Sequence, residues 1–226
     1  MTAMLHIAAV LTPDEVAEVR ERIGTADWVD GRATAGHLSA AVKHNRQLAE
    51  DDPATLAAAA VVRAALARSG VFASAALPAR IAPPLFNCHG IGEHYGDHID
   101  SAIRSVTGAT MRLDLSATLF LSDPADYIGG ELVIRGATGS EAFKLAAGDL
   151  LLYASGAIHQ VAPVTSGQRQ ACFFWVQSHV RDPSQRKILF DLDAVIANLR
   201  TENASRESIL LLTAQYHNLL RMWSCS

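Results

Sequence analysis

Near its middle the chain reads Gly92-Glu93-His94-Tyr95-Gly96-Asp97-His98-Ile99-Asp100. On an extended strand, residues two positions apart project from the same face, so His98 and Asp100 can bind one small ion together. A third ligand from a distant strand would place two imidazoles and one carboxylate on one side of a metal. This facial arrangement leaves the opposite side open and is associated with non-haem Fe(II) oxygenases.

The best candidate for the third ligand is His159, which follows Gly156-Ala157-Ile158 and lies between two strand-like runs. A His-x-Asp pair alone is common by chance, and the specificity comes from its combination with His159 and Arg169. If residues 163–168 form a hairpin loop, His159 and Arg169 can both face the interior of a barrel. A buried guanidinium needs an anionic partner, and a ligand carboxylate that accepts two parallel hydrogen bonds would serve.

The order His-x-Asp, then His, then Arg ten residues later resembles the Fe(II)/2-oxoglutarate-dependent dioxygenases of the prolyl 4-hydroxylase-like branch. Longer segments resemble, more narrowly, the bacterial PKHD-type hydroxylases, which are often associated with iron uptake. The resemblance covers nearly the whole chain, and its segments are Trp28–Gly36, Tyr95–Asp100, Gly129–Leu132, Gly148–Tyr153, Phe173–Ser178 and Leu189–Asp193.

This resemblance implies that His98, Asp100 and His159 bind Fe(II) as the catalytic centre and that Arg169 binds the distal carboxylate of 2-oxoglutarate. It implies hydroxylation of a C–H bond by O2, with release of succinate and CO2 and with L-ascorbate as a candidate reductant. The substrate stays open between a peptidyl side chain and a small metabolite, including a siderophore-related compound.

The chain departs from the family pattern before its glycine-rich approach to His98. Related sequences commonly have Asn-Arg-Tyr where this chain reads Asn87-Cys88-His89. The tyrosine at that position commonly helps to bind 2-oxoglutarate, so either His89 donates that hydrogen bond or the contact is absent. Tyr95, three residues before His98, is a further candidate for contact with the co-substrate, and a half-buried barrel tyrosine is the alternative.

Apolar residues that alternate with polar ones indicate a mainly β fold with flanking helices. Leu113 to Leu121 give the clearest alternation, and several such short strands suggest a sandwich or a double-sheet jelly roll. Helix signals stand at Thr12-Pro13-Asp14-Glu15, over residues 54–68 and in two segments after Val180. We expect an N-terminal helical support region (1–79), a jelly-roll dioxygenase domain with a double-stranded β-helix core (80–179) and a C-terminal helical extension (180–226). The last two helices could pack on the barrel or on another subunit, which leaves a homo-oligomer open.

The segment from Ala26 to Glu50 has mixed polarity and is harder to assign. The resemblance makes it a candidate wall of the substrate site. Lys43, His44 and Arg46 could contact an acidic substrate, and a solvated charged face is the alternative.

Composition excludes several classes of protein. The net charge of −4 comes without a basic cluster, so we expect no nucleic-acid partner. Three widely spaced cysteines argue against a disulfide framework and against structural zinc, and they suit a reducing compartment. Since no apolar run approaches the length of a spanning helix, we expect no membrane partner and a soluble, cytoplasmic protein.

Other functions share parts of this pattern. A cupin-like metalloenzyme that does not use 2-oxoglutarate would need the metal ligands but not Arg169. A non-catalytic sensor of iron or 2-oxoglutarate would keep both features without turnover, and a structural interaction module would need neither. Iron-dependent formation of succinate distinguishes a 2-oxoglutarate dioxygenase from the cupin-like enzyme.

Overall fold

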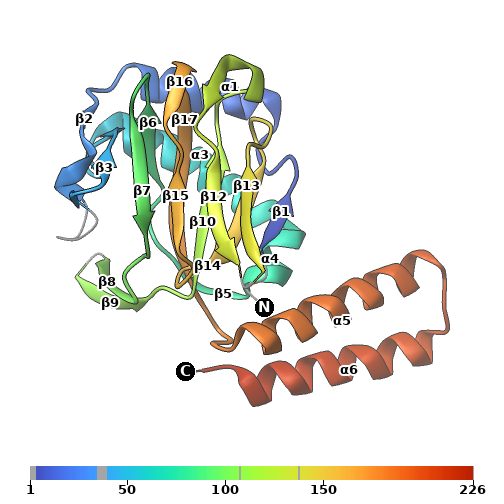
Figure 1. The fold of residues 1–226 in the computed structure, drawn as a ribbon. Coiled ribbons are helices and arrows are strands. Elements are labelled where there is room, and N and C mark those ends of the chain that lie inside the picture. The colour runs from blue at the N-terminus through green and yellow to red at the C-terminus, as the bar shows by residue number, and fades with distance from the viewer. Residues whose placement is uncertain (1–3, 35–39, 107, 137, 226) are drawn as a thin grey trace.

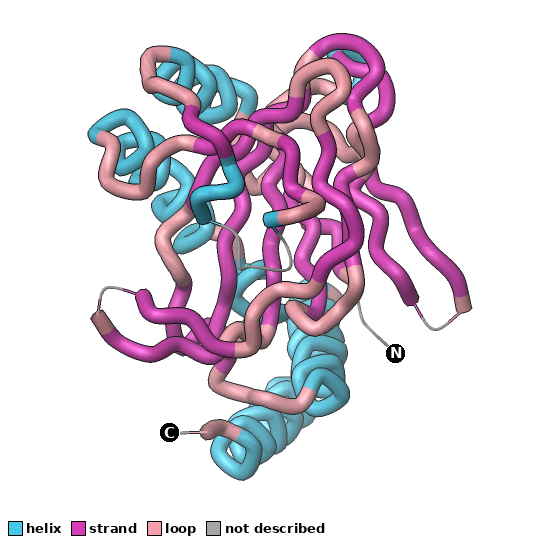
Figure 2. Tube along the Cα trace, turned by 60° about the vertical axis from the view of Figure 1, so that its left-hand side comes forward, coloured by secondary structure: helices cyan, strands magenta, loops and turns pink. Residues whose placement is uncertain are grey.

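The computed structural model describes residues 4–34, 40–106, 108–136 and 138–225. Two facing antiparallel β-sheets form its centre, helices cover the outer face of one sheet, and a helical hairpin extends away at the C-terminus (Figures 1 and 2). This is the expected mainly β fold with flanking helices, and the prediction of a jelly-roll core is confirmed.

The larger sheet contains the longest strands. Its order is β1 (Leu5–Ile7), β14 (Leu150–Ala154), β10 (Leu115–Phe120), β17 (Arg169–Ser178), β6 (Leu85–His89), β4 (Arg46–Gln47) and β2 (Val29–Asp30), and β5 (Pro78–Ile81) also pairs with β17. Side chains at even positions of β17, such as Phe174, join the core under the helices, whereas Phe173 and Trp175 face the other way. This alternation turns Arg169 toward the space between the sheets.

The smaller sheet faces this surface. Its order is β13 (Gly139–Phe143), β12 (Leu132–Gly136), β15 (His159–Val161), β7 (His94–His98) and β3 (Lys43–His44). The structure also has two two-stranded sheets. One is the hairpin of β8 (Ile103–Val106) with β9 (Ala109–Arg112), and the other pairs β11 (Tyr127–Gly129) with the distant strand β16 (Val164–Gly167). Residues before 80 therefore add strands to both sheets, besides their helices.

The N-terminal helices pack on the larger sheet. They are α1 (Pro13–Gly24), α3 (Pro53–Arg68) and α4 (Gly70–Ala76). Short 3-10 turns lie at η1 (Gly31–Thr34), between β2 and β3, and at η2 (Pro124–Asp126), between β10 and β11. The expected capping box is present, since the Thr12 side chain accepts from the Glu15 amide while the Glu15 carboxylate accepts from the Thr12 amide. Ser69 ends α3 and caps α4, a helix that the sequence pattern did not indicate.

The C-terminal hairpin consists of α5 (Pro183–Thr201) and α6 (Arg206–Trp223). It starts at the base of the barrel and projects away from it (Figure 1). On α5, Leu189 and Ile196 are buried, but Ile188 and Val195 are about half exposed, and no described α6 residue is fully buried. The hairpin is thus covered on one side only.

The described helices can be compared with the length and apolarity that a membrane span requires. No single helix there is both long and apolar enough to cross a bilayer, and the one pair that would pass together, α3 with α4, is bent by 83°.

Candidate metal and co-substrate site

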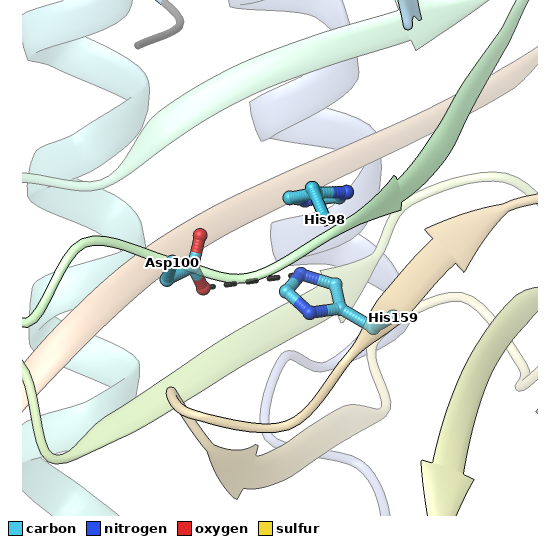
Figure 3. A group of neighbouring side chains, drawn as sticks. All are labelled: His98, Asp100 and His159. Carbon is cyan, nitrogen blue, oxygen red and sulfur yellow. Dashed lines mark ion pairs between the residues drawn. The ribbon is translucent and has the colours of Figure 1, made fainter. Parts of the chain in front are cut away.

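Three potential metal ligands converge between the two sheets. His98 ends β7, Asp100 follows it directly, and His159 begins the neighbouring strand β15, where it pairs with His98 across the ladder. One ligand atom from each residue lies within 4.8 Å of the other two (Figure 3). The three side chains predicted to meet are therefore close enough to surround one small cation.

Backbone carbonyls fix the tautomer of both imidazoles. His98 Nδ1 lies 2.8 Å from the carbonyl oxygen of Gly96, and His159 Nδ1 lies 3.0 Å from that of Ala157. Because a carbonyl can only accept, each Nδ1 carries the proton and donates it. In the neutral form of each ring, the free lone pair is then on Nε2, which can bind a metal.

Burial keeps His98 neutral. Burial and then the neighbouring His159 lower the pKa of His98 to about 4, and the Tyr95 ring covers it with a centroid distance of 3.5 Å and an interplanar angle of 13°. A neutral imidazole at pH 7 does not need to lose a proton before it binds a cation.

The carboxylate is held by serines that the sequence analysis did not single out. Ser116 Oγ lies 2.5 Å from Asp100 Oδ2 and 2.9 Å from Ser155 Oγ. Since Ser116 has one hydroxyl proton, it donates to Asp100 and accepts from Ser155. The signal was present in the alternation of β10, whose six residues are all buried, so that its polar positions face the cavity rather than solvent.

Arg169 supplies an unpaired buried cation. Only 1% of the Arg169 surface is exposed, and none of its three guanidinium nitrogens has a hydrogen-bond partner among the described protein groups. Burial lowers its pKa, but the charge has no carboxylate beside it. An unpartnered buried guanidinium costs several kcal/mol, so this environment fits an anionic ligand that enters the cavity.

One cavity of about 150 Å³ joins these features. Its walls include the three potential metal ligands and Arg169, together with Tyr95. His89 is not among the described residues that line it. His89 is fully buried opposite Arg169 on β6, and its Nε2 lies 3.3 Å from Asn45 Nδ2. Burial and then the Arg169 charge hold the pKa of His89 well below its usual value.

Comparison with known proteins agrees with this geometry. Residues 84–177 match the model of the 2OG-Fe(II) oxygenase superfamily, and residues 184–224 match that of the PKHD-type hydroxylase C-terminal domain. A PKHD-type hydroxylase of Janthinobacterium sp. (strain Marseille) is 49% identical over 98% of this chain and 99% of its own length. Another, from Xanthomonas campestris pv. campestris (strain B100), is 51% identical with the same coverage.

Solved structures share the fold at low sequence identity. A prolyl hydroxylase from Trichoplax adhaerens, in complex with a peptide fragment of a hypoxia inducible factor, superposes with a TM-score of 0.55 at 16% identity. The superposition covers 76% of this chain and 82% of the Trichoplax chain. HygX from Streptomyces hygroscopicus, with nickel and 2-oxoglutarate bound, gives 0.54 at 17% identity with the same coverage.

Proposed function

The chain belongs to the PKHD-type hydroxylases within the 2OG-Fe(II) oxygenase superfamily, and we propose that His98, Asp100 and His159 are its iron ligands and that Arg169 binds the distal carboxylate of 2-oxoglutarate. The protein is thus an Fe(II)- and 2-oxoglutarate-dependent hydroxylase with an unidentified substrate. The convergence of the three ligand atoms within 4.8 Å is the observation that carries the residue assignment.

The donor set supports iron chemistry. Two imidazole nitrogens and one carboxylate on one side of an ion would form the facial set typical of non-haem Fe(II), and such a set would leave the other side of the ion open to 2-oxoglutarate and O2. Arg169 supports the second half of the proposal, because a guanidinium can hold a carboxylate through two parallel hydrogen bonds.

The protein side chains orient the bound groups and exclude water, and they do not themselves react. When bound, iron would let O2 oxidise 2-oxoglutarate and the substrate together: one oxygen atom would enter succinate, formed with loss of CO2, and the other would become the hydroxyl group on the substrate carbon. Ser116 holds the Asp100 carboxylate in place, and the carbonyls of Gly96 and Ala157 hold the two imidazoles. The buried walls around Arg169 keep bulk water from its charge.

Tyr95 and His89 have different places in this proposal. Tyr95 lines the cavity and stacks on His98, which supports a role in contacting the co-substrate and in holding the His98 ring. His89 lies beside Arg169 on the neighbouring strand, where its neutral ring does not compete for the anion. L-ascorbate is proposed as the external reductant.

Anaerobic titration with Fe(II) and 2-oxoglutarate tests the assignment. We expect the visible charge-transfer band of an iron and 2-oxo acid complex in the wild-type protein, and succinate on exposure to O2. His98→Ala should lose the band, whereas His217→Ala, which removes an exposed imidazole on α6, should keep it. Arg169→Ala should bind iron but need far more 2-oxoglutarate, and unchanged 2-oxoglutarate affinity in that variant would refute the role of Arg169.

A further inference from the structure

The proposed function leaves two cations in the cavity without a role. The described residues that line the cavity include three basic side chains, Lys43, Arg104 and Arg169, and one acidic side chain, Asp100. Arg169 is assigned to 2-oxoglutarate and Asp100 to the metal. Lys43 and Arg104 belong to neither assignment.

Lys43 is a buried ammonium on the edge strand β3. Its residue is 5% exposed, its Nζ donates to Gln47 Oε1 at 3.0 Å, and its Nζ lies 5.3 Å from the centre of the Tyr95 ring. Burial, and then the charge of Arg104, lower the pKa of Lys43 to about 8. The cavity therefore holds two cations close enough to repel each other, and an anion between them would relieve that repulsion.

Arg104 lies on β8, where the β8–β9 pair borders the cavity. Its Cζ lies 4.9 Å from the centre of the Trp175 ring, and its guanidinium pairs with Glu50. Glu50 is half exposed and does not line the cavity. An exposed ion pair of this kind is weak, so Arg104 can also bind an anion on its cavity side.

The net charge of the cavity with iron and 2-oxoglutarate bound also favours an anionic ligand. Iron(II) carries two positive charges and 2-oxoglutarate carries two negative charges, so together they do not change the net charge of the cavity. The three basic and one acidic side chains that line it leave an excess of two positive charges. Glu50 offsets part of this excess from outside. Since a cavity with a net positive lining attracts anions, the remaining ligand of the site is expected to be an acid.

An apolar wall stands beside the two cations. Phe173 and Trp175 meet edge to face, with ring centroids 5.6 Å apart, and Leu113 packs in the same cluster. These rings and the half-exposed Ile99 border the same cavity. A ligand that fits here needs a flat or apolar framework next to its charge.

We propose that the substrate of this hydroxylase is an organic acid whose anionic group binds between Lys43 and Arg104 while its apolar or aromatic framework packs against Phe173 and Trp175. This inference rests on the proposed function, because it assumes that iron and 2-oxoglutarate occupy the rest of the cavity. It narrows the substrate from any C–H donor to molecules with a carboxylate or a similar anion near the hydroxylated carbon.

Matched acid and amide probes test the proposal. Calorimetry is done anaerobically on protein loaded with Fe(II) and saturating 2-oxoglutarate, with benzoate, 2-naphthoate and indole-3-acetate each compared with the corresponding carboxamide. We expect at least one acid to bind about tenfold more tightly than its amide, as one charge-assisted contact would provide. Arg104→Gln and Lys43→Met should each remove most of this preference without weakening 2-oxoglutarate, and Arg104→Lys should retain part of it.

Control variants remove comparable cations outside the cavity. Arg22 forms an ion pair with Glu18 on α1, and Lys144 lies 4.2 Å over the Tyr127 ring, so Arg22→Gln and Lys144→Met should leave the preference unchanged. If no acid binds more tightly than its amide, or if the Lys43 and Arg104 variants weaken acid and amide equally, the proposal is wrong. Loss of 2-oxoglutarate affinity in Lys43→Met would assign Lys43 to the co-substrate instead. A wild-type protein without the visible band would overturn the proposed function, whereas a band without acid preference overturns only this inference.

Discussion

Ser116 donates a hydrogen bond of 2.5 Å to the Oδ2 atom of Asp100, and its own oxygen accepts from Ser155. The potential metal ligand is therefore held from the larger sheet, while the two imidazoles come from the smaller one. The spacing of the ligands thus depends on the distance between the sheets, and Ser116 is the side chain that links them at this point.

Ser116→Ala is expected to weaken metal binding by about 10- to 100-fold, because partners that orient a ligand typically matter that much. Titration with Fe(II) or Mn(II) measures the change. Ser122→Ala is the matched control, since Ser122 is also buried and hydrogen-bonded but contacts the backbone of residues 168 and 170. Equal metal affinity in the two variants would show that the Ser116 contact has no such role.

Gly130→Ala is expected to lower 2-oxoglutarate affinity and to destabilise the fold. Gly130 has φ +67°, and an added Cβ would lie 3.1 Å from Arg169 Cδ. Gly92→Ala separates the two effects, because Gly92 has φ +82° with no atom within 4 Å of the added Cβ. Each variant should lose about 1–2 kcal/mol of unfolding free energy from its backbone conformation, but only Gly130→Ala should also need more 2-oxoglutarate to form the charge-transfer band.

Lys43 should make stability depend on pH in the alkaline range. Its pKa is about 8 in the folded protein against an ordinary value of 10.5. Between these values the unfolded chain binds more protons than the folded one, so the free energy of unfolding of the wild type rises with pH. Below pH 8 both states are charged and the burial cost is fully present. Urea denaturation of the metal-free wild type and of Lys43→Met is measured from pH 7 to 10.5. The free energy of unfolding of the wild type should rise relative to that of the variant, and a difference that does not change with pH would contradict the buried ammonium.

The three cysteines should differ in how fast they react with a thiol reagent. Cys225 is exposed, whereas Cys88 and Cys172 are buried. Burial raises the pKa of Cys88 to about 11 and also raises that of Cys172, so neither supplies the thiolate that reacts. A chromogenic disulfide reagent should titrate one thiol in the native protein and all three in denaturant. Cys225→Ser should abolish the native reaction, and a fast second thiol in the native wild type would show that the barrel opens at β6 or β17.

Local patterns were enough to predict the β fold, its family, and the positions of His98, Asp100 and His159, which lie together in the structure. These depend on spacing along single strands, where side-chain direction follows from residue number. The role of the three residues as ligands stays a proposal that the titration tests.

Features that depend on long-range packing were not predictable in the same way. Arg104 reaches the cavity only because the β8–β9 pair borders it, and Ser116 faces inward only because both sides of β10 are covered. Ile188 and Val195 fit a helical stripe, yet they remain half exposed because the hairpin leaves the barrel. Sequence periodicity identifies an apolar face but not what covers it.

The direct pairing of His98 with His159 across β7 and β15 has a consequence for folding errors. A slip of one residue between these strands would turn His159 to the opposite side of the sheet. If His159 is an iron ligand, a mispaired chain would lack that ligand and would not assemble the proposed iron site. On this proposal, only correctly assembled molecules would activate O2.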